Sequence, residues 1–160
     1  MSKRDLARAL RHASKENRLG AGVICDSCKE ADLRCLQRSL ERTLCAECRL
    51  VQEGKPRYEL HHPAGRHNDS FVIPMHANEH TVMSDYQEDW PDETLRNPDG
   101  DLLHRHAAIP RSNHDFLMRR AELSQKDAIE FEALAQFLKK EFTLDWSTAF
   151  AEWRERKDSQ

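Results

Sequence analysis

Four of the five cysteines in this sequence form two pairs with the same internal spacing. Two residues separate Cys25 from Cys28 and Cys45 from Cys48, and sixteen residues lie between the pairs. A two-residue gap lets both thiolates of a tight turn face one ion, and two such turns complete a tetrahedron of sulfurs. The spacing therefore predicts a structural zinc site with no position for water, rather than unrelated buried thiols or a redox pair. We expect the remaining Cys35 to be a buried, inert thiol.

A second group of side chains that could do chemistry is rich in histidine. His61 and His62 are adjacent, and His80 lies in the first turn of an expected helix that can return it to this pair. Phosphodiester hydrolysis needs a divalent ion to neutralise charge and a general base to activate water, and histidine suits a base at neutral pH. A carbonyl or carboxylate must also orient the base. One histidine of the pair can hold the ion with His80, and the other can act as the base.

The elements that must position these histidines indicate a small α+β protein. They are strands over 58–62 and 71–73, a loop over 63–70 and a helix from about 77 to 90. Pro74 is expected to close the second strand and Pro91 to stop the helix. The leucines between the cysteine pairs fit a helix about as well as a strand pair, so the secondary structure of residues 23–57 stays open.

Flanking segments differ strongly in charge. Residues 1–22 carry a net charge of +4, and residues 3–15 read as a helix ended by Gly20. This basic helix can follow a phosphate backbone or pack on the core. The expected organisation is a basic N-terminal helix (1–22), a zinc-bound core (23–92), an acidic linker (93–111) and a C-terminal helical region (112–160).

The C-terminal region contains two apolar stripes at helical spacing. They are Phe131, Leu134, Ala135, Leu138 and Phe142, followed by Trp146, Phe150 and Trp153. Both stripes predict core or helix–helix packing, and the alternative is a surface for another protein or a second copy.

Composition limits the class of protein. The chain has 160 residues, of which 38% are hydrophobic and 33% charged, so a metal would add to the stability of a modest core. The net charge of −3 argues against a generally basic nucleic-acid binder. Because neither a signal peptide nor a membrane span is recognisable, we expect a cytoplasmic protein, in which paired cysteines indicate metal rather than disulfides.

Three consecutive patterns between residues 61 and 91 resemble a known family. They are His61-His62-Pro-Ala-Gly-Arg66-x-Asn68, then Ile73-Pro74-Met75-His76-x-Asn78-x-His80, then Ser84-x2-Gln87-x2-Trp90-Pro91. Together with the paired cysteines, this region of roughly 20–92 resembles the HNH endonucleases common in phages and bacteria. Members of that family fold as a ββα-metal finger, and many add a zinc site. The resemblance implies an HNH nuclease core over 23–92 with flanking helices.

The resemblance also implies roles for individual residues. His62 would be the general base, and His61 and His80 would bind a catalytic Mg²⁺ or Mn²⁺. Asn68 best matches the middle asparagine of the family, which orients the base. A backbone carbonyl or Asn78 is the alternative for this orienting role.

Two further residues are candidates for contact with substrate. Arg66 can pair with two phosphate oxygens at once, unless it pairs with Asp69. His76 can line the site or bind the ion. It occupies, with Glu79, a place where many relatives have cysteines, so their zinc role would fall to Cys45 and Cys48.

The expected function is metal-dependent hydrolysis of phosphodiester bonds in DNA, by nicking or double-strand cleavage. One alternative is a zinc-dependent nucleic-acid-binding module with a decayed nuclease site. Another is an interaction protein that joins a larger assembly, or itself, through the C-terminal helices.

Overall fold

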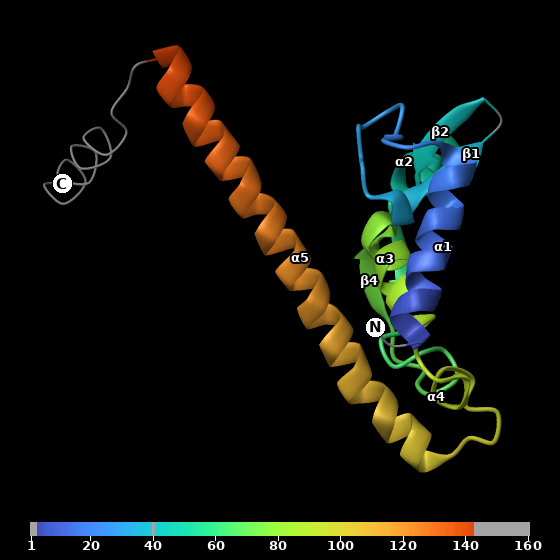
Figure 1. The fold of residues 1–160 in the computed structure, drawn as a ribbon. Coiled ribbons are helices and arrows are strands. Elements are labelled where there is room, and N and C mark those ends of the chain that lie inside the picture. Colours follow the sequence, from blue (N-terminus) through green and yellow to red (C-terminus); the bar gives the residue numbers. More distant parts are fainter. Residues whose placement is uncertain (1–2, 40, 143–160) are drawn as a thin grey trace, which may run out of the picture. The chain divides into compact units, whose positions relative to one another are not determined.

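The structure is a computed structural model that describes residues 3–39 and 41–142. The chain forms two compact units, residues 1–117 and 118–160, and mixes helices with two small sheets, so the expected α+β class is confirmed (Figure 1). The helices are α1 (Lys3–Leu19), the 3₁₀ helix η1 (Leu33–Cys35), α2 (Ala46–Gln52), α3 (Ala77–Gln87), α4 (Asp92–Arg96) and α5 (Leu102–Phe142). The strands are β1 (Leu36–Ser39), β2 (Arg42–Cys45), β3 (Tyr58–His61) and β4 (Ile73–His76). Over the described residues, none of the helices has both the length and the apolar character that a membrane crossing requires.

The region between the cysteine pairs adopts the strand-pair alternative. β1 and β2 are antiparallel, with Leu36 opposite Cys45 and Gln37 opposite Leu44. Leu36 and Leu44 are buried in the main core, which explains why packing selects strands where the leucine spacing alone was ambiguous.

The main core joins the cysteine-containing region to the helices. Its buried members are Leu19, Cys25, Cys35, Leu36, Leu44, Cys45, Val82, Met83 and Tyr86. These residues come from the end of α1, the turn at Cys25, η1, the first hairpin and α3. Cys35 is buried as expected, and its thiol contacts the carbonyl oxygen of Asn78 at 3.4 Å.

A second antiparallel hairpin, β3 and β4, leads directly into α3. The predicted second strand over 71–73 is placed too early, because β4 runs from Ile73 to His76 and contains Pro74 opposite Leu60. A strand with a partner on one side only tolerates proline, since the missing N–H can face away from that partner. The strand–strand–helix order expected around the histidines is present.

Helix α1 packs through its charged side. Arg11 contacts the Asp89 carboxylate at 2.9 Å, His12 contacts Asp85 at 2.9 Å, and Arg8 also pairs with Asp89. The predicted helix over 3–15 extends to Leu19 and ends at Gly20, whose φ of +105° favours glycine. The basic helix α1 therefore packs on the acidic end of α3. This is the alternative in which the helix packs on the core rather than following a phosphate backbone.

The expected linker over 93–111 instead contains α4 and the first turns of α5. The Asp101 carboxylate accepts hydrogen bonds from the backbone N–H groups of Leu103 (2.7 Å) and His104 (3.2 Å), and so caps the start of α5. These two bonds lower the pKa of Asp101. Pro110 lies inside α5 rather than in a loop. The Asp101 cap and the burial of Ala108 against Trp90 stabilise a helix in this stretch. Its acidic residues and prolines had indicated a linker.

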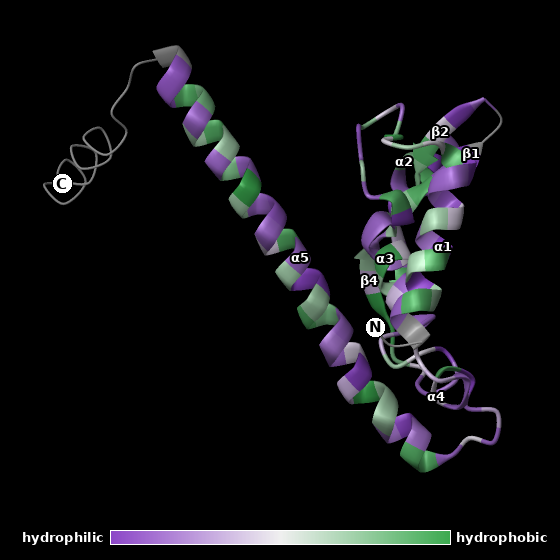
Figure 2. Cartoon of the chain, in the orientation of Figure 1, coloured by the Kyte–Doolittle hydropathy of each residue, from purple (hydrophilic) through white to green (hydrophobic). Residues whose placement is uncertain are grey.

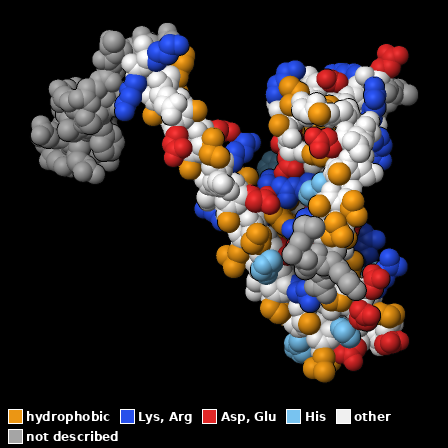
Figure 3. All heavy atoms as spheres, viewed as in Figure 1, with side chains coloured by type: hydrophobic (Ala, Val, Ile, Leu, Met, Phe, Trp, Pro, Cys, Tyr) orange, Lys and Arg blue, Asp and Glu red, His pale blue; other side chains and the backbone are white. Residues whose placement is uncertain are grey.

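Within the second unit, α5 exposes its predicted apolar stripe. Phe131 is 72% exposed and Leu134 is 47% exposed. Hydrophobic residues recur along this helix (Figure 2), and hydrophobic side chains lie on its surface (Figure 3). The packing of this stripe in a core or against another helix stays a prediction. The second stripe, Trp146, Phe150 and Trp153, lies outside the described residues.

Candidate four-cysteine centre and histidine site

The four paired cysteines converge on one point. The sulfur atoms of Cys25, Cys28, Cys45 and Cys48 all lie within 4.8 Å of one another, and the Cys28 and Cys45 sulfurs are 3.6 Å apart. A tetrahedral zinc site with Zn–S bonds of about 2.3 Å requires sulfur–sulfur distances of about 3.8 Å. The four thiols are therefore positioned to hold a metal such as zinc with little movement.

Local backbone geometry explains how each pair forms. The first turn places Lys29 at φ 67°, with its N–H bonded to the Cys25 carbonyl at 3.0 Å. The second pair begins at the end of β2, where the Cys45 sulfur caps α2 by accepting from the N–H of Cys48 at 3.5 Å. The first turn is joined to β2 because Asp26 and Thr43 exchange hydrogen bonds of 2.8 and 2.9 Å.

Proton affinities differ within the cluster. Burial raises the pKa of Cys48, and the neighbouring thiols of Cys28 and Cys45 raise it further. Burial opposes ionisation of Cys25 as well, but backbone N–H groups, those of Cys28 and Cys45 first, bring its pKa down to about 6. Thiols packed this closely resist becoming thiolates together unless a cation compensates their charge, so metal binding should release protons.

The second hairpin carries histidines on both of its faces. Because side chains alternate along a strand, Glu59 and His61 share the face of β3 that packs toward α3, and Tyr58 points the other way. His80 in the first turns of α3 lies over this face, with its ring 5.4 Å from the ring of His61 in an edge-on arrangement. His61 and His80 are thus brought together, as expected.

The tautomer of His80 is set by a carboxylate. His80 Nδ1 lies 2.8 Å from Glu59 Oε2, and a carboxylate can only accept, so Nδ1 carries the proton. In the neutral ring, Nε2 of His80 then holds a free lone pair. A carboxylate that orients a histidine in this way is a frequent companion of metal-binding histidines.

His61 is buried and keeps an unpaired nitrogen. It is only 1% exposed, and its Nε2 is one of the buried side-chain atoms that lack a hydrogen-bond partner among the described residues. Burial first, and then the charges of His80 and His62, lower its pKa to about 4, so the ring is neutral at pH 7. His61 and His80 thus each keep an Nε2 without a hydrogen-bond partner among the described residues.

His62 follows the end of β3 and faces the loop. Its Nδ1 lies 3.4 Å from the carbonyl oxygen of Asp69, which can only accept, so Nδ1 is the donor and Nε2 keeps its lone pair. The side chain of Gln87 holds the backbone here, donating to the carbonyl oxygens of His62 (2.9 Å) and Pro63 (3.1 Å). His62 is therefore arranged to accept a proton at Nε2.

The two asparagines considered for orienting His62 bond elsewhere. The Asn68 amide is buried and donates to the carbonyl oxygens of Ala64 (2.8 Å) and Thr94 (2.7 Å). Asn78 accepts from the backbone N–H of Glu47 and donates to Glu30, which ties α3 to the cysteine-containing region. Of the orienting groups considered, the backbone carbonyl is the one that contacts His62.

The two candidate substrate contacts lie apart from the histidine pair. His76 is on the opposite face of the hairpin, stacked on Tyr58 with ring centroids 4.3 Å apart, and its Nδ1 is 3.4 Å from Glu47. Arg66 is exposed in the loop after His62 and lines a hollow with Asp69. Within the described chain, no ion pair joins Arg66 to Asp69.

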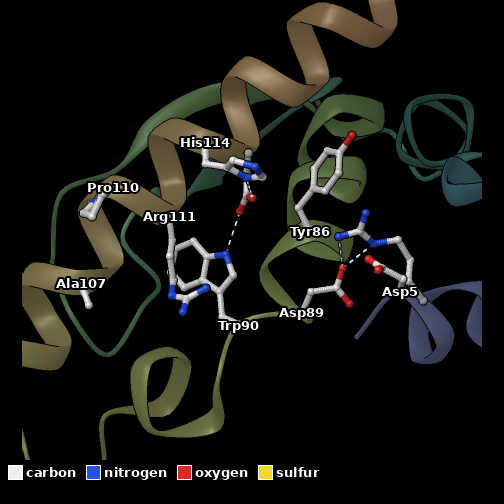
Figure 4. Close-up of a pocket in the computed structure, with 10 residues that line it drawn as sticks. Asp5, Tyr86, Asp89, Trp90, Ala107, Pro110, Arg111 and His114 are labelled. Atoms are coloured by element: carbon white, nitrogen blue, oxygen red, sulfur yellow. Dashed lines mark hydrogen bonds and ion pairs between the residues drawn. The ribbon is translucent and has the colours of Figure 1, made fainter. Parts of the chain in front are cut away.

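A hollow of about 520 Å³ lies where α1, the end of α3 and the first turns of α5 meet (Figure 4). Trp90 donates its indole N–H to Asp115 at 2.7 Å, and Asp89 pairs with Arg8 of α1. Because these polar groups already hydrogen-bond or pair with one another, we interpret the hollow as a packing gap between helices. Trp90 anchors the end of α3.

Gln87 stands in one of the sequence patterns without an assigned role, and Glu59 was not singled out. Strand alternation could have found Glu59, because it lies two residues before His61 and so shares its face. No local signal identifies Gln87, whose contact with the His62 backbone depends on how α3 crosses the loop.

In the part of the chain that the structure describes, the four cysteines are the only set of three or more histidine, cysteine or acidic side chains gathered closely enough to hold a metal ion. The histidine pair would need oxygen ligands from water or substrate to complete a metal shell. Comparisons with protein-family models, with curated proteins and with solved structures find no match.

Proposed function

We propose that this chain is a metal-dependent endonuclease of the HNH type, which hydrolyses phosphodiester bonds in DNA and is stabilised by zinc in its four-cysteine centre. The observation that carries the proposal is the end of β3. There His61 and His80 lie together, each with a free Nε2, and the adjacent His62 also keeps its Nε2 free. The hairpin followed by α3 supports the same family.

The histidines have separate roles in the proposed reaction. His62 Nε2 takes a proton from a water molecule, and the water oxygen bonds to phosphorus as the bond to the 3′-oxygen breaks. The carbonyl of Asp69 holds the imidazole and stabilises the Nδ1–H as the ring becomes positive. His61 and His80 would hold a divalent cation, which supplies charge neutralisation at the phosphate and the leaving oxygen.

The donor atoms bear on the identity of that ion. Imidazole nitrogens suit transition-metal ions better than Mg²⁺, which prefers oxygen ligands. Since His61 and His80 offer nitrogen, we expect Mn²⁺ to support more activity than Mg²⁺ at equal concentration.

A nicking assay tests the function. Supercoiled plasmid is incubated with zinc-loaded wild type, with His62→Ala and with His106→Ala, each with Mn²⁺, with Mg²⁺ or with no added divalent ion. Omission is preferable to a strong chelator, which would also strip structural zinc. We expect nicking to need the added ion and to fall by about 10²–10⁴-fold in His62→Ala.

His106→Ala is the matched control, because His106 is an exposed histidine of α5 outside the proposed site. It should cleave like wild type. A folded, zinc-loaded wild type that does not nick, or a His62→Ala variant that nicks normally, would contradict the proposal.

The exposed stripe of α5 favours a second candidate, an assembly module that binds a partner or itself. Phe131 and Leu134 are 72% and 47% exposed, an uncommon state for large apolar side chains in a lone chain. Phe131→Glu should abolish self-association measured by light scattering and leave nicking unchanged. If nicking is absent in wild type but association is present, the assembly function is favoured.

A further inference from the structure

A polar hollow of about 380 Å³ lies beside His62. It is lined by Arg66, His67, Asn68, Asp69 and Ser70 of the loop and by Arg105 of α5. Asp69 connects it to the histidine site, because its carbonyl is the oxygen that contacts His62 Nδ1.

The hollow has an excess of positive charge in an acidic part of the chain. Residues 59–111 carry a net charge of −6 and contain four arginines, of which two, Arg66 and Arg105, line it. Among the described residues neither guanidinium has a hydrogen bond or ion pair, whereas Arg96 pairs with Asp92 at 3.6 Å. Two unpaired arginines facing one hollow indicate an anion as their partner.

The acid in the hollow is already engaged. Asp69 Oδ1 accepts from the backbone N–H of Phe71 at 3.0 Å, so the carboxylate stabilises its own loop. Two guanidinium groups and one carboxylate leave the hollow with a net charge of +1.

Buried hydrogen bonds fix the two walls of the hollow relative to each other. Asn97 donates to the Asn68 side-chain oxygen at 2.9 Å, and it exchanges hydrogen bonds of 2.8 and 3.1 Å with the backbone of Asp101. Asn68 belongs to the loop that carries Arg66, and Asp101 caps the helix that carries Arg105. This chain of contacts fixes the backbone segments that carry the two arginines, which lowers the entropic cost of binding.

We propose that this hollow is a subsite for a backbone phosphate of the nucleic-acid substrate, next to the phosphate that is cleaved, with Arg66 and Arg105 as its ligands. The inference rests on the proposed nuclease function and gives Asn68 a positioning role in substrate binding. His67 faces the same anion and strengthens the subsite when protonated.

The test measures binding without cleavage. The background is full-length, zinc-loaded His62→Ala with no added divalent ion, and the probe is a fluorescein-labelled 20-base-pair DNA duplex followed by anisotropy from low to moderate salt. Arg66→Gln and Arg105→Gln are compared with Arg96→Gln, an exposed control in α4. A second titration with inorganic pyrophosphate, followed by NMR, separates a polynucleotide from free phosphate.

We expect each hollow variant to bind the duplex about tenfold more weakly, from the loss of a charged hydrogen bond. The plot of log affinity against log salt should become shallower by about 0.9 for each lost phosphate contact. Arg96→Gln should match its parent, and unchanged zinc content and melting temperature should show that the exposed substitutions leave the fold intact.

Equal affinity and salt slope in parent and hollow variants would overturn the subsite, whether or not wild type nicks DNA. Pyrophosphate binding that needs both arginines, without duplex binding, would overturn the polynucleotide assignment. Duplex binding that needs both arginines in a protein whose wild type does not nick would uphold the subsite while removing the nuclease.

Discussion

The two candidate centres of this chain differ in how fully their ligands are supplied. The cysteine centre gathers four sulfurs within 4.8 Å, a closed tetrahedral set. The histidine site brings together two imidazoles, His61 and His80, and fixes one of them through Glu59. A metal in the first centre has all its ligands from protein, and one in the second must also bind water or substrate.

The two centres also differ in their position relative to the main core. Cys25 and Cys45 are members of the main core, so loss of a metal there removes support from both hairpins and α3. The histidine site sits at the edge of that core, where Phe116 packs at 6.1 Å against the ring of His61. We expect changes in the first to act on stability and changes in the second on metal affinity and chemistry.

The largest effect should come from Cys45→Ser. Structural zinc contributes about 10–16 kcal/mol of apparent binding energy to small zinc domains, so its loss should unfold most of residues 1–117. Zinc measured by plasma mass spectrometry should fall from one ion per chain to none, and cooperative melting should be lost.

Cys35→Ala is the matched control for that experiment. Cys35 is buried in the same core but lies outside the four-sulfur cluster, so this variant should keep its zinc. Loss of zinc from Cys35→Ala, or its retention in Cys45→Ser, would show that the cluster is assigned to the wrong sulfurs.

Asn68→Ala tests whether Asn68 stabilises the fold or acts in catalysis. The substitution leaves the Thr94 and Ala64 carbonyls and the Asn97 amide without their partner, so unfolding in urea should show a loss of about 1–3 kcal/mol. A variant with full stability but no nicking would instead favour a direct role for Asn68 at His62.

Glu59→Gln should weaken the second centre and leave the first intact. Gln can still accept from His80 Nδ1 but carries no charge, so affinity for the activating ion should fall by about 10–100-fold. The concentration of Mn²⁺ at half-maximal nicking measures this, and activity at saturating Mn²⁺ should recover. Glu93→Gln, an exposed change on α4, is the control, and an equal shift in both variants would remove the positioning role.

The last expected effect is a dependence of stability on pH. His61 has a pKa of about 4 in the fold against 6.5 in the unfolded chain, so below pH 6.5 the unfolded chain binds a proton that the fold excludes. Stability should fall by about 1.4 kcal/mol per pH unit from pH 6.5 to about 4, with no contribution above pH 6.5.

The difference in unfolding free energy between wild type and His61→Gln, measured without a second divalent ion, isolates this slope. Zinc loss in acid affects both proteins and cancels in the difference. Parallel curves for the two proteins over that range would mean that His61 is protonated as easily in the fold as in the unfolded chain.

Much of the histidine site was predictable, and the exceptions have physical causes. The strand–loop–strand–helix order over 58–90 was predicted, and the return of His80 to His61 follows from that order. The role of Asn68 did not follow, because its amide partners are 26 and 29 residues away, at Thr94 and Asn97. The stretch 93–111 was predicted as a linker because composition does not reveal the Asp101 cap or the burial of Ala108.

By itself the sequence determined the features that depend on short spacing: the two Cys-x2-Cys turns, the end of α1 at Gly20 and the adjacency of His61 and His62. The tertiary structure alone decided which charges neutralise each other, so that α1 turns its arginines toward Asp85 and Asp89 and leaves Leu6 and Leu10 exposed. It also decided that Arg66 and Arg105 have no side-chain partner among the described residues. The physical reason is that charge pairing and burial depend on contacts between residues distant in the chain, which no local pattern specifies.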